Sequence, residues 1–166
     1  IFVSITNQRE TFVIFDKKTG KPVCNAIVWQ CRRGQSICNN ISKSKIKTRL
    51  IKNSTGLELD TYFPASKLSW LLMNNKNLAA KLKNGSVLFG TIDTYLIYRL
   101  TKMQSYSTDY TNASRTLFFD NKKLIWSEKL IKLFNLNLRY LPEVKESASI
   151  FGETNFNGLL KFKIPI

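Results

Sequence analysis

The chain opens with three short apolar segments separated by polar turns, and this pattern sharply limits the folds it can adopt. Ile1–Thr6, Thr11–Asp16 and Val23–Trp29 are rich in β-branched and aromatic residues, which favour strands. Lys17–Pro22 joins the second segment to the third, and its Gly-Lys-Pro ending is typical of a hairpin turn. We therefore expect Thr11–Asp16 and Val23–Trp29 to pair as antiparallel strands.

Helical signals dominate the middle of the chain. Gln35–Lys52 is predicted to be a helix, although it is polar and only weakly periodic, and Gly56 provides a stop signal after it. Pro64 can open the next helix, because proline is tolerated at the first helical position. Ser127 can cap another. Further helices are predicted at Asn77–Lys83, Thr94–Leu100 and Glu128–Phe134, and further strands at Ser86–Phe89 and Ile150–Glu153. This mixture indicates an α/β fold without fixing the order of the strands.

Composition excludes several classes of active site. The 166 residues suit one domain. Histidine is absent, which excludes Ser–His and Cys–His catalytic pairs and every zinc site that needs histidine. The three cysteines, Cys24, Cys31 and Cys38, form no CxxC motif, so we expect free thiols in a reducing cytoplasm and no metal site.

The net charge of +15 raises the alternative of a nucleic-acid-binding protein. The densest basic run, Lys43–Lys52, has no interleaved aromatic residues for base stacking and no glycine-rich phosphate loop. We interpret the excess of lysine as a bias spread over the surface and expect no nucleic-acid partner. No apolar stretch is long enough to span a membrane, and no signal peptide is recognisable, so we expect no membrane association.

A polar turn between the first two predicted strands is the first candidate site. Asn7–Glu10 follows a strand end, where α/β proteins commonly bind ligands. Arg9 offers a planar fork of donors and Glu10 offers only acceptors, so the pair could hold the neighbouring hydroxyls of a polyol. The alternative is an exposed ion pair between Arg9 and Glu10, which would contribute little to stability.

Other candidates are Trp29, Tyr62, Asp93 and Asp109. The face of Trp29 could cover the carbon backbone of a small ligand, although core packing is the more common role for a tryptophan. Tyr62 would bring one phenolic hydroxyl. Asp93 and Asp109 could orient water or a metal ion, but each is more often a cap or turn residue. The residues by themselves indicate an α/β domain with a polyol-type site.

Seven blocks of the sequence form a recognisable pattern: Thr6–Glu10, Asn25–Arg33, Thr55–Phe63, Leu88–Ile97, Thr108–Thr116, Leu141–Val144 and Phe151–Asn155. They cover nearly the whole chain in order, which is more specific than a single short motif. In these blocks the chain resembles the glycerol kinases of the FGGY carbohydrate kinase family, and their bacterial members most closely.

The resemblance implies part of an actin-like (ribonuclease H-like) N-terminal lobe, with a mixed sheet and flanking helices. It implies transfer of the γ-phosphoryl group of ATP, with Mg²⁺, to glycerol, giving sn-glycerol 3-phosphate. Arg9 and Glu10 match the family's glycerol-binding pair, Trp29 the aromatic wall of its pocket, and Tyr62 the tyrosine that completes the polyol contacts. A cytoplasmic homo-oligomer is also expected.

The resemblance further implies that residues 1–166 are an internal fragment of such a kinase, inactive alone. The family's phosphate-binding Asp-x-Gly-Thr-Thr turn is expected before Ile1. Its catalytic aspartate is expected just beyond Ile166, so no catalytic residue is assigned in this chain. The second lobe is likewise expected outside it.

One loop departs from the bacterial pattern. Gly158, Lys161 and Lys163 stand where many members bind fructose 1,6-bisphosphate through a glycine-rich, arginine-bearing loop. Lysine keeps the positive charge but loses the bidentate geometry of arginine, so this regulation is in doubt. Two alternatives remain open: another polyol or sugar kinase of the same family, or a non-catalytic remnant of a decaying gene.

Overall fold

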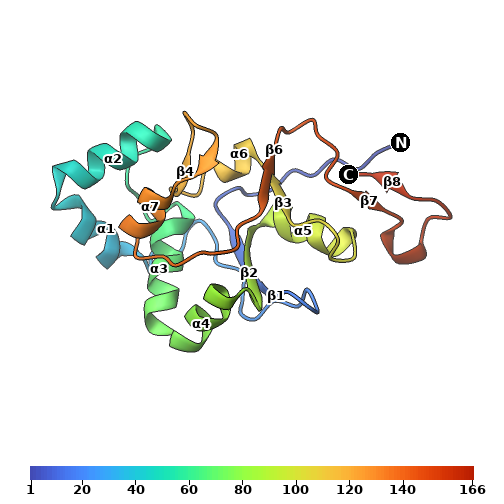
Figure 1. Cartoon of the computed structure of the whole chain (residues 1–166), viewed down its shortest axis with the longest axis horizontal. Helices are drawn as coiled ribbons and strands as arrows, with labels where there is room; N and C mark the ends of the chain where they lie inside the picture. The colour runs from blue at the N-terminus through green and yellow to red at the C-terminus, as the bar shows by residue number, and fades with distance from the viewer.

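The computed structural model describes all residues from Ile1 to Ile166 and has a mixed α/β architecture (Figure 1), as the sequence predicts. No helix has the length and apolar character needed to cross a membrane. In chain order the elements are β1 (Phe12–Asp16), α1 (Gln35–Ser42), α2 (Lys45–Thr55), α3 (Pro64–Asn74), α4 (Lys76–Asn84), β2 (Val87–Thr91), α5 (Ile92–Leu100), β3 (Ser107–Asp109), α6 (Tyr110–Ala113), β4 (Phe119–Asp120), β5 (Ile125–Trp126), α7 (Glu128–Leu133), β6 (Glu143–Lys145), β7 (Glu153–Thr154), a 3₁₀ turn (Phe156–Gly158) and β8 (Ile164–Pro165).

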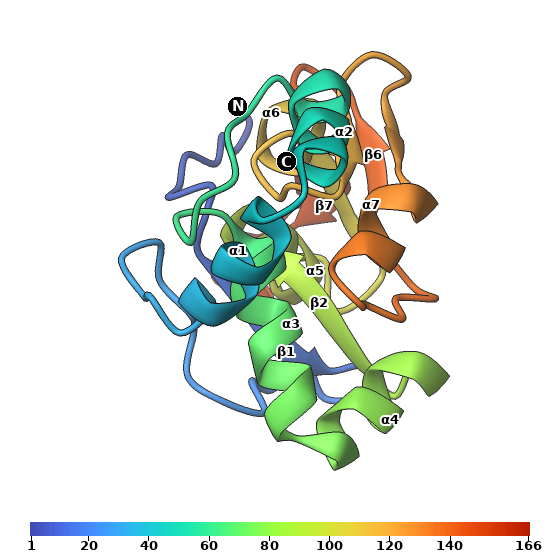
Figure 2. The same ribbon diagram turned by 90° about the vertical axis from the view of Figure 1, so that its left-hand side faces the viewer.

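The centre of the molecule is the antiparallel pair of β1 and β2, in which Ile14 lies opposite Phe89. Alternate residues of a strand point to opposite faces. Phe12 and Ile14 accordingly join the large core cluster, to which α3 and α4 contribute, while Val13 and Phe15 pack with Tyr98 of α5 in a second cluster. The β1–β2 pair is therefore buried on both faces, between helices (Figures 1 and 2).

Two of the three strands predicted at the start of the chain are not formed. Ile1–Thr6 has no regular structure, and Val3 donates to the carbonyl of Pro165. Val23–Trp29 runs antiparallel to β1 but meets it only at isolated bridges, Phe12 with Ile27 inside this segment and Phe15 with Pro22 just before it. The continuous partner of β1 is β2, which comes much later in the chain. The predicted hairpin pairing of the second and third segments was thus only partly right.

Helix boundaries follow the local signals more closely. The single helix predicted over Gln35–Lys52 divides into α1 and α2, because Ser44 is extended and its side chain caps α2 at Lys47. Gly56 ends α2 in the left-handed conformation, with φ of 73°, as its stop signal predicts. Pro64 opens α3, and Ser127 caps α7.

Gly34, just before α1, holds the segment that carries Trp29 close to α3. A Cβ atom at this position would lie 2.5 Å from the Ser66 hydroxyl and 2.6 Å from the Ser66 carbonyl carbon. Only glycine allows this approach of one backbone to the other. The loop that contains Trp29 is thereby fixed beside the amino-terminal turn of α3, which Tyr62 shortly precedes.

Candidate functional site

The carboxylate of Glu10 is buried and paired, but not with its neighbour Arg9. Its Oε1 atom accepts a hydrogen bond of 2.7 Å from Nε of Arg115, and the Glu10 side chain is only 7% exposed. The Arg115 guanidinium also lies 4.8 Å from the centre of the Phe63 ring. Arg9 is exposed in the same turn. The alternative of an Arg9–Glu10 ion pair is therefore wrong, and Glu10 keeps a second carboxylate oxygen for another donor.

Trp29 and Tyr62 are brought together, although they come from different segments. Their ring centroids are 5.3 Å apart with an interplanar angle of 54°, and Tyr62 also packs edge-on against Phe63 at 5.4 Å. Both rings are half-buried. Aromatic pairs in such tilted arrangements form a rigid wall with polar tips. This wall is of the kind expected beside the carbon backbone of a small polyol.

Lys67 of α3 connects the three segments that carry these residues. Its side chain is fully buried, and Nζ lies 2.9 Å from the carbonyl oxygen of Tyr62, 3.4 Å from that of Trp29 and 3.5 Å from that of Glu10. The carbonyl of Val28 is a fourth acceptor, at 3.1 Å. Burial lowers the pKa of Lys67 to about 8. Three of the four predicted site residues thus meet around one ammonium group.

Arg115 and Lys67 are functional candidates that the sequence did not reveal as such. Arg115 lies inside one of the blocks that carry the family resemblance. Lys67 stands in a helix of otherwise apolar and small residues, Pro64-Ala-Ser-Lys-Leu-Ser-Trp70. A lone lysine among buried positions is unusual, because lysine is almost never fully buried unless it is paired. The position of Lys67 among apolar and small residues was therefore the feature of the sequence that could have identified it as a functional candidate.

The polar turn is anchored on its other side by Asn7. Its Nδ2 donates to Oδ1 of Asn112 at 3.0 Å, and Asn112 in turn donates to Oδ1 of Asp109. Asp109 caps α6, which confirms the more common role weighed for it. Burial raises the pKa of Asp109, but hydrogen bonds from Ser147, Asn112 and Thr111 outweigh it and hold the pKa below its ordinary value.

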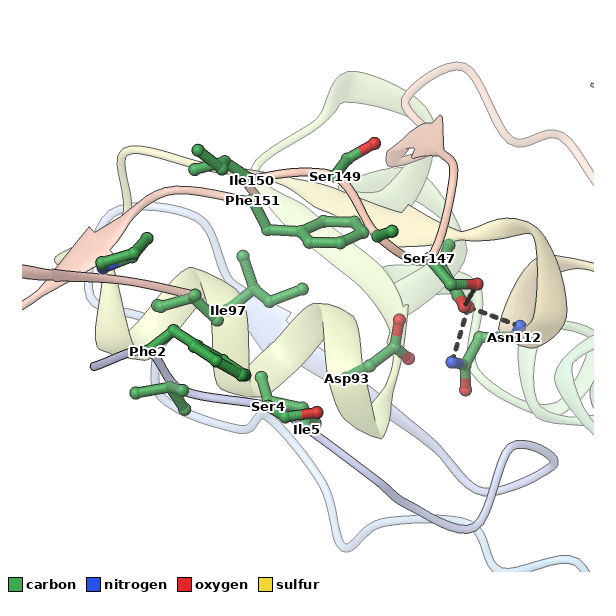
Figure 3. Close-up of a pocket in the computed structure, with 15 residues that line it drawn as sticks. Phe2, Ser4, Ile5, Asp93, Ile97, Asn112, Ser147, Ser149, Ile150 and Phe151 are labelled. Atoms are coloured by element: carbon green, nitrogen blue, oxygen red, sulfur yellow. Dashed lines mark hydrogen bonds between the residues drawn. The ribbon is translucent and has the colours of Figure 1, made fainter.

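Asp93 lines a separate cavity of about 480 Å³ (Figure 3). Its Oδ2 accepts from the Thr108 hydroxyl at 2.6 Å, whereas the buried Oδ1 has no hydrogen-bond partner. Burial raises the pKa of this carboxyl. Phe2, Ile97 and Phe151 also line the cavity, whereas Arg9, Glu10, Trp29 and Tyr62 do not. Asp93 is therefore not part of the site predicted around the Asn7–Glu10 turn.

Gly158, Lys161 and Lys163 lie in the loop between β7 and β8. Gly158 has a φ of 96°, and both lysines are exposed. This loop and α1 lie at opposite ends of the molecule (Figure 1). A sugar-bisphosphate site here stays a prediction. Nowhere in the 166 residues do three or more His, Cys, Asp or Glu side chains come together as possible metal ligands.

The sequence of this chain is similar to those of known carbohydrate kinases. The model of the FGGY family of carbohydrate kinases, N-terminal domain, matches residues 1–166. The chain is 46% identical over 166 residues to the glycerol kinase of Fusobacterium nucleatum and 48% identical over 164 residues to glycerol kinase 1 of Thermotoga maritima. It covers 33% of the length of each, and 100% and 99% of its own residues are matched.

Solved structures of carbohydrate kinases have the same fold as this chain. The Plasmodium falciparum glycerol kinase with ADP superimposes with a TM-score of 0.90 at 41% identity, over 99% of this chain and 33% of that one. A ligand-bound xylulose kinase from Lactobacillus acidophilus, 21% identical, shares the fold with a TM-score of 0.78, over 99% of this chain and 34% of the other. The chain therefore belongs to the FGGY family of carbohydrate kinases and has the fold of their N-terminal domain.

Proposed function

We propose that this chain supplies the acceptor side of a glycerol kinase, an enzyme that transfers the γ-phosphoryl group of ATP to glycerol to give sn-glycerol 3-phosphate. The observation that carries the proposal is the convergence of Glu10, Trp29 and Tyr62 around Lys67, with Arg9 in the same turn. The high identity to glycerol kinases over the whole chain supports it.

Each proposed contact has a chemical role that its surroundings permit. The exposed guanidinium of Arg9 can donate two parallel hydrogen bonds to neighbouring hydroxyl oxygens. Glu10 has one oxygen engaged by Arg115, so the other can accept from a hydroxyl. The Trp29 face can pack against the carbon atoms, and the Tyr62 hydroxyl can complete the polar contacts. Together they would fix the orientation of a three-carbon triol.

The chain offers no comparable case for the donor side of the reaction. Phosphoryl transfer depends on positioning, metal and a base on the attacking hydroxyl. The residues described here bring together no set of metal ligands, and the chain spans a third of the length of its relatives. We predict that the 166 residues alone do not phosphorylate glycerol.

The proposal extends to the surroundings of the enzyme. Free Cys24, Cys31 and Cys38 support a reducing, cytoplasmic location. A homo-oligomer of the parent kinase is proposed from the resemblance alone. Regulation through Gly158, Lys161 and Lys163 is supported only by the two exposed positive charges.

The test is a hybrid kinase in which this chain replaces the matching third of the Plasmodium falciparum enzyme. We expect glycerol-dependent formation of ADP. Because Arg9 is exposed, Arg9→Ala should leave folding intact while it removes a charged donor, and it should raise the KM for glycerol about 10- to 100-fold. Tyr62→Phe, which removes only a hydroxyl, should raise it less.

Lys18→Ala, at an exposed position in the turn after β1, is the matched control and should leave the KM for glycerol unchanged. The KM for ATP should stay within about twofold of the parent value in all variants. If Arg9→Ala behaves like Lys18→Ala, the assignment of Arg9 and of the acceptor site is wrong.

A further inference from the structure

We propose that Lys67 is a positioning residue of the acceptor site: its buried ammonium group fixes the relative placement of the three segments that carry Glu10, Trp29 and Tyr62. The inference rests on the proposed function, because it assigns Lys67 a part in binding the acceptor substrate. Lys67 itself is not proposed to contact the substrate.

The first support is the set of acceptors. An ammonium group has three N–H donors and no acceptor. Lys67 directs them to four backbone carbonyls, at 2.9 Å from Tyr62, 3.1 Å from Val28, 3.4 Å from Trp29 and 3.5 Å from Glu10. At least one donor is therefore shared. None of the four acceptors is a carboxylate. Lys67 therefore binds backbone carbonyl groups from several segments and does not form an ion pair.

The second support is the sequence distance that these bonds close. Lys67 is separated by 57 residues from Glu10 and by 38 from Trp29, but by only five from Tyr62. Neither the Glu10 turn nor the loop that carries Trp29 lies in a continuous strand or helix. The bridge between Phe12 and Ile27 joins these two segments two residues away, but no ladder continues from it to Glu10 or Trp29. At Glu10, Trp29 and Tyr62 themselves, the bonds to one nitrogen hold the three segments together.

The third support is the energetic cost of the group. A fully buried ammonium is unfavourable, and the lowered pKa of Lys67 reflects that burial. Apolar residues of similar volume often serve stability equally well or better. The lysine is therefore better explained by the geometry that it imposes than by stability. Because misplacement of a binding group by about 1 Å can reduce rates about 100-fold, such geometry is important to a kinase.

The test compares three variants. Lys67→Met keeps a long unbranched side chain, one atom shorter than lysine, and removes its donors, whereas Lys67→Gln introduces an amide that can donate two hydrogen bonds. Leu82→Ala is the control for general destabilisation, because Leu82 is a buried core residue of α4 and is not one of the residues that Lys67 binds.

The first readout is ¹⁹F NMR of the 166-residue chain labelled with 5-fluorotryptophan. Trp126 serves as an internal reference, since its indole nitrogen bonds the Pro142 carbonyl. We expect Lys67→Met to shift or broaden the Trp29 signal and leave Trp126 unchanged. Leu82→Ala should lower the melting temperature without moving Trp29. An unchanged Trp29 signal in Lys67→Met would overturn the proposal.

The second readout is kinetic and uses the hybrid kinase. We expect Lys67→Met to raise the KM for glycerol at least about tenfold, with the KM for ATP within about twofold, and Lys67→Gln to fall between Lys67→Met and the parent. If both KM values rise together, or if neither changes while the melting temperature falls as we expect for Leu82→Ala, Lys67 has only a structural role. Should Lys67→Met not fold, Lys67→Gln decides by the same criteria.

The two proposals can fail separately. A hybrid that phosphorylates a different polyol but not glycerol contradicts the proposed function, while the Trp29 signal still decides the role of Lys67. A hybrid that uses glycerol normally with Lys67→Met or Lys67→Gln in place supports the proposed function and overturns the positioning role.

Discussion

At the scale of single residues, the site depends on two charged groups that are buried in different ways. Glu10 is neutralised by Arg115 through a close ion pair, whereas the ammonium of Lys67 is held only by backbone carbonyls. Removing one partner of a buried pair leaves an uncompensated charge and costs more than the pair contributes when intact. Glu10 should therefore respond strongly to the loss of Arg115, whereas substitution of Lys67 should mainly change the geometry of the site.

Arg115→Met should be much more destabilising than an equivalent change at the surface. It leaves the buried carboxylate of Glu10 without its partner, which we expect to cost about 3 kcal/mol. Lys52→Met breaks the exposed Lys52–Glu58 pair and should cost less than about 1 kcal/mol. Urea denaturation of both variants measures the difference, and equal midpoints would show that the Arg115–Glu10 pair is not a buried pair in solution.

Lys67 should make stability increase with pH above neutrality. Its pKa is about 8 in the folded chain against 10.5 as the ordinary value, so between these limits the unfolded state binds more protons than the folded state. The free energy of unfolding should therefore rise as the pH rises from about 8 to 10.5, as the cost of burying the charge disappears.

The measurement is the difference in unfolding free energy between the parent chain and Lys67→Met, across that range of pH. The titratable and charged groups that face Lys67 are Cys31, Glu10, Arg33 and Asp60, and they are present in both proteins. We expect the unfolding free energy of the parent chain to rise relative to that of Lys67→Met as the pH increases. A relative value that stays constant or falls with pH would contradict the lowered pKa of Lys67.

At the scale of elements, local signals were sufficient where a boundary depends on neighbouring residues. Gly56, Pro64 and Ser127 mark helix ends because capping and backbone conformation involve residues only a few positions apart. The same reasoning failed for Ile1–Thr6 and Val23–Trp29. Their composition favours strands, but a strand also requires a distant partner, and β1 pairs continuously with β2 instead.

Gly34, just before α1, lies in close contact with Ser66 of α3. In Gly34→Ala the new Cβ would meet backbone and side-chain atoms of Ser66 at 2.5 to 2.7 Å, so α1 and α3 must separate. We expect a loss of about 2 kcal/mol in stability together with a raised KM for glycerol in the hybrid kinase. At Gly56 no atom lies within 4 Å, so Gly56→Ala should cost only about 1 kcal/mol, from its positive φ, and leave KM unchanged. Equal effects of the two variants on KM would contradict the role given to Gly34.

At the scale of the whole molecule, the sequence predicted the α/β class and the family, but not how the site is assembled. Glu10 was identified in its turn, whereas its true partner Arg115 lies 105 residues away. Lys67 was missed for the same reason, since two of the three segments that supply its acceptors are distant in sequence, 57 residues away at Glu10 and 38 at Trp29. Contacts of this kind depend on the folded topology, which local composition does not contain.

Apolar side chains are exposed near the two chain termini, and this too can be measured. Phe2 is 75% exposed and Ile150 67%, and both line the cavity that contains Asp93. Large exposed apolar patches promote association. We expect the chain to bind the dye 8-anilinonaphthalene-1-sulfonate (ANS), and the double variant Phe2→Ser, Ile150→Ser to bind it clearly less. If the variant binds the dye as strongly as the parent chain, the apolar surface that binds ANS lies elsewhere on the molecule.

We propose that this chain determines an acceptor site for glycerol, and substrate competition in the hybrid kinase is the decisive test. The measurement is kcat/KM for glycerol, xylulose and gluconate under identical conditions, with ATP saturating. We predict a preference for glycerol of at least about 100-fold that falls sharply in Arg9→Ala. Equal use of the three substrates, or a preference for a sugar that Arg9→Ala does not alter, would contradict it.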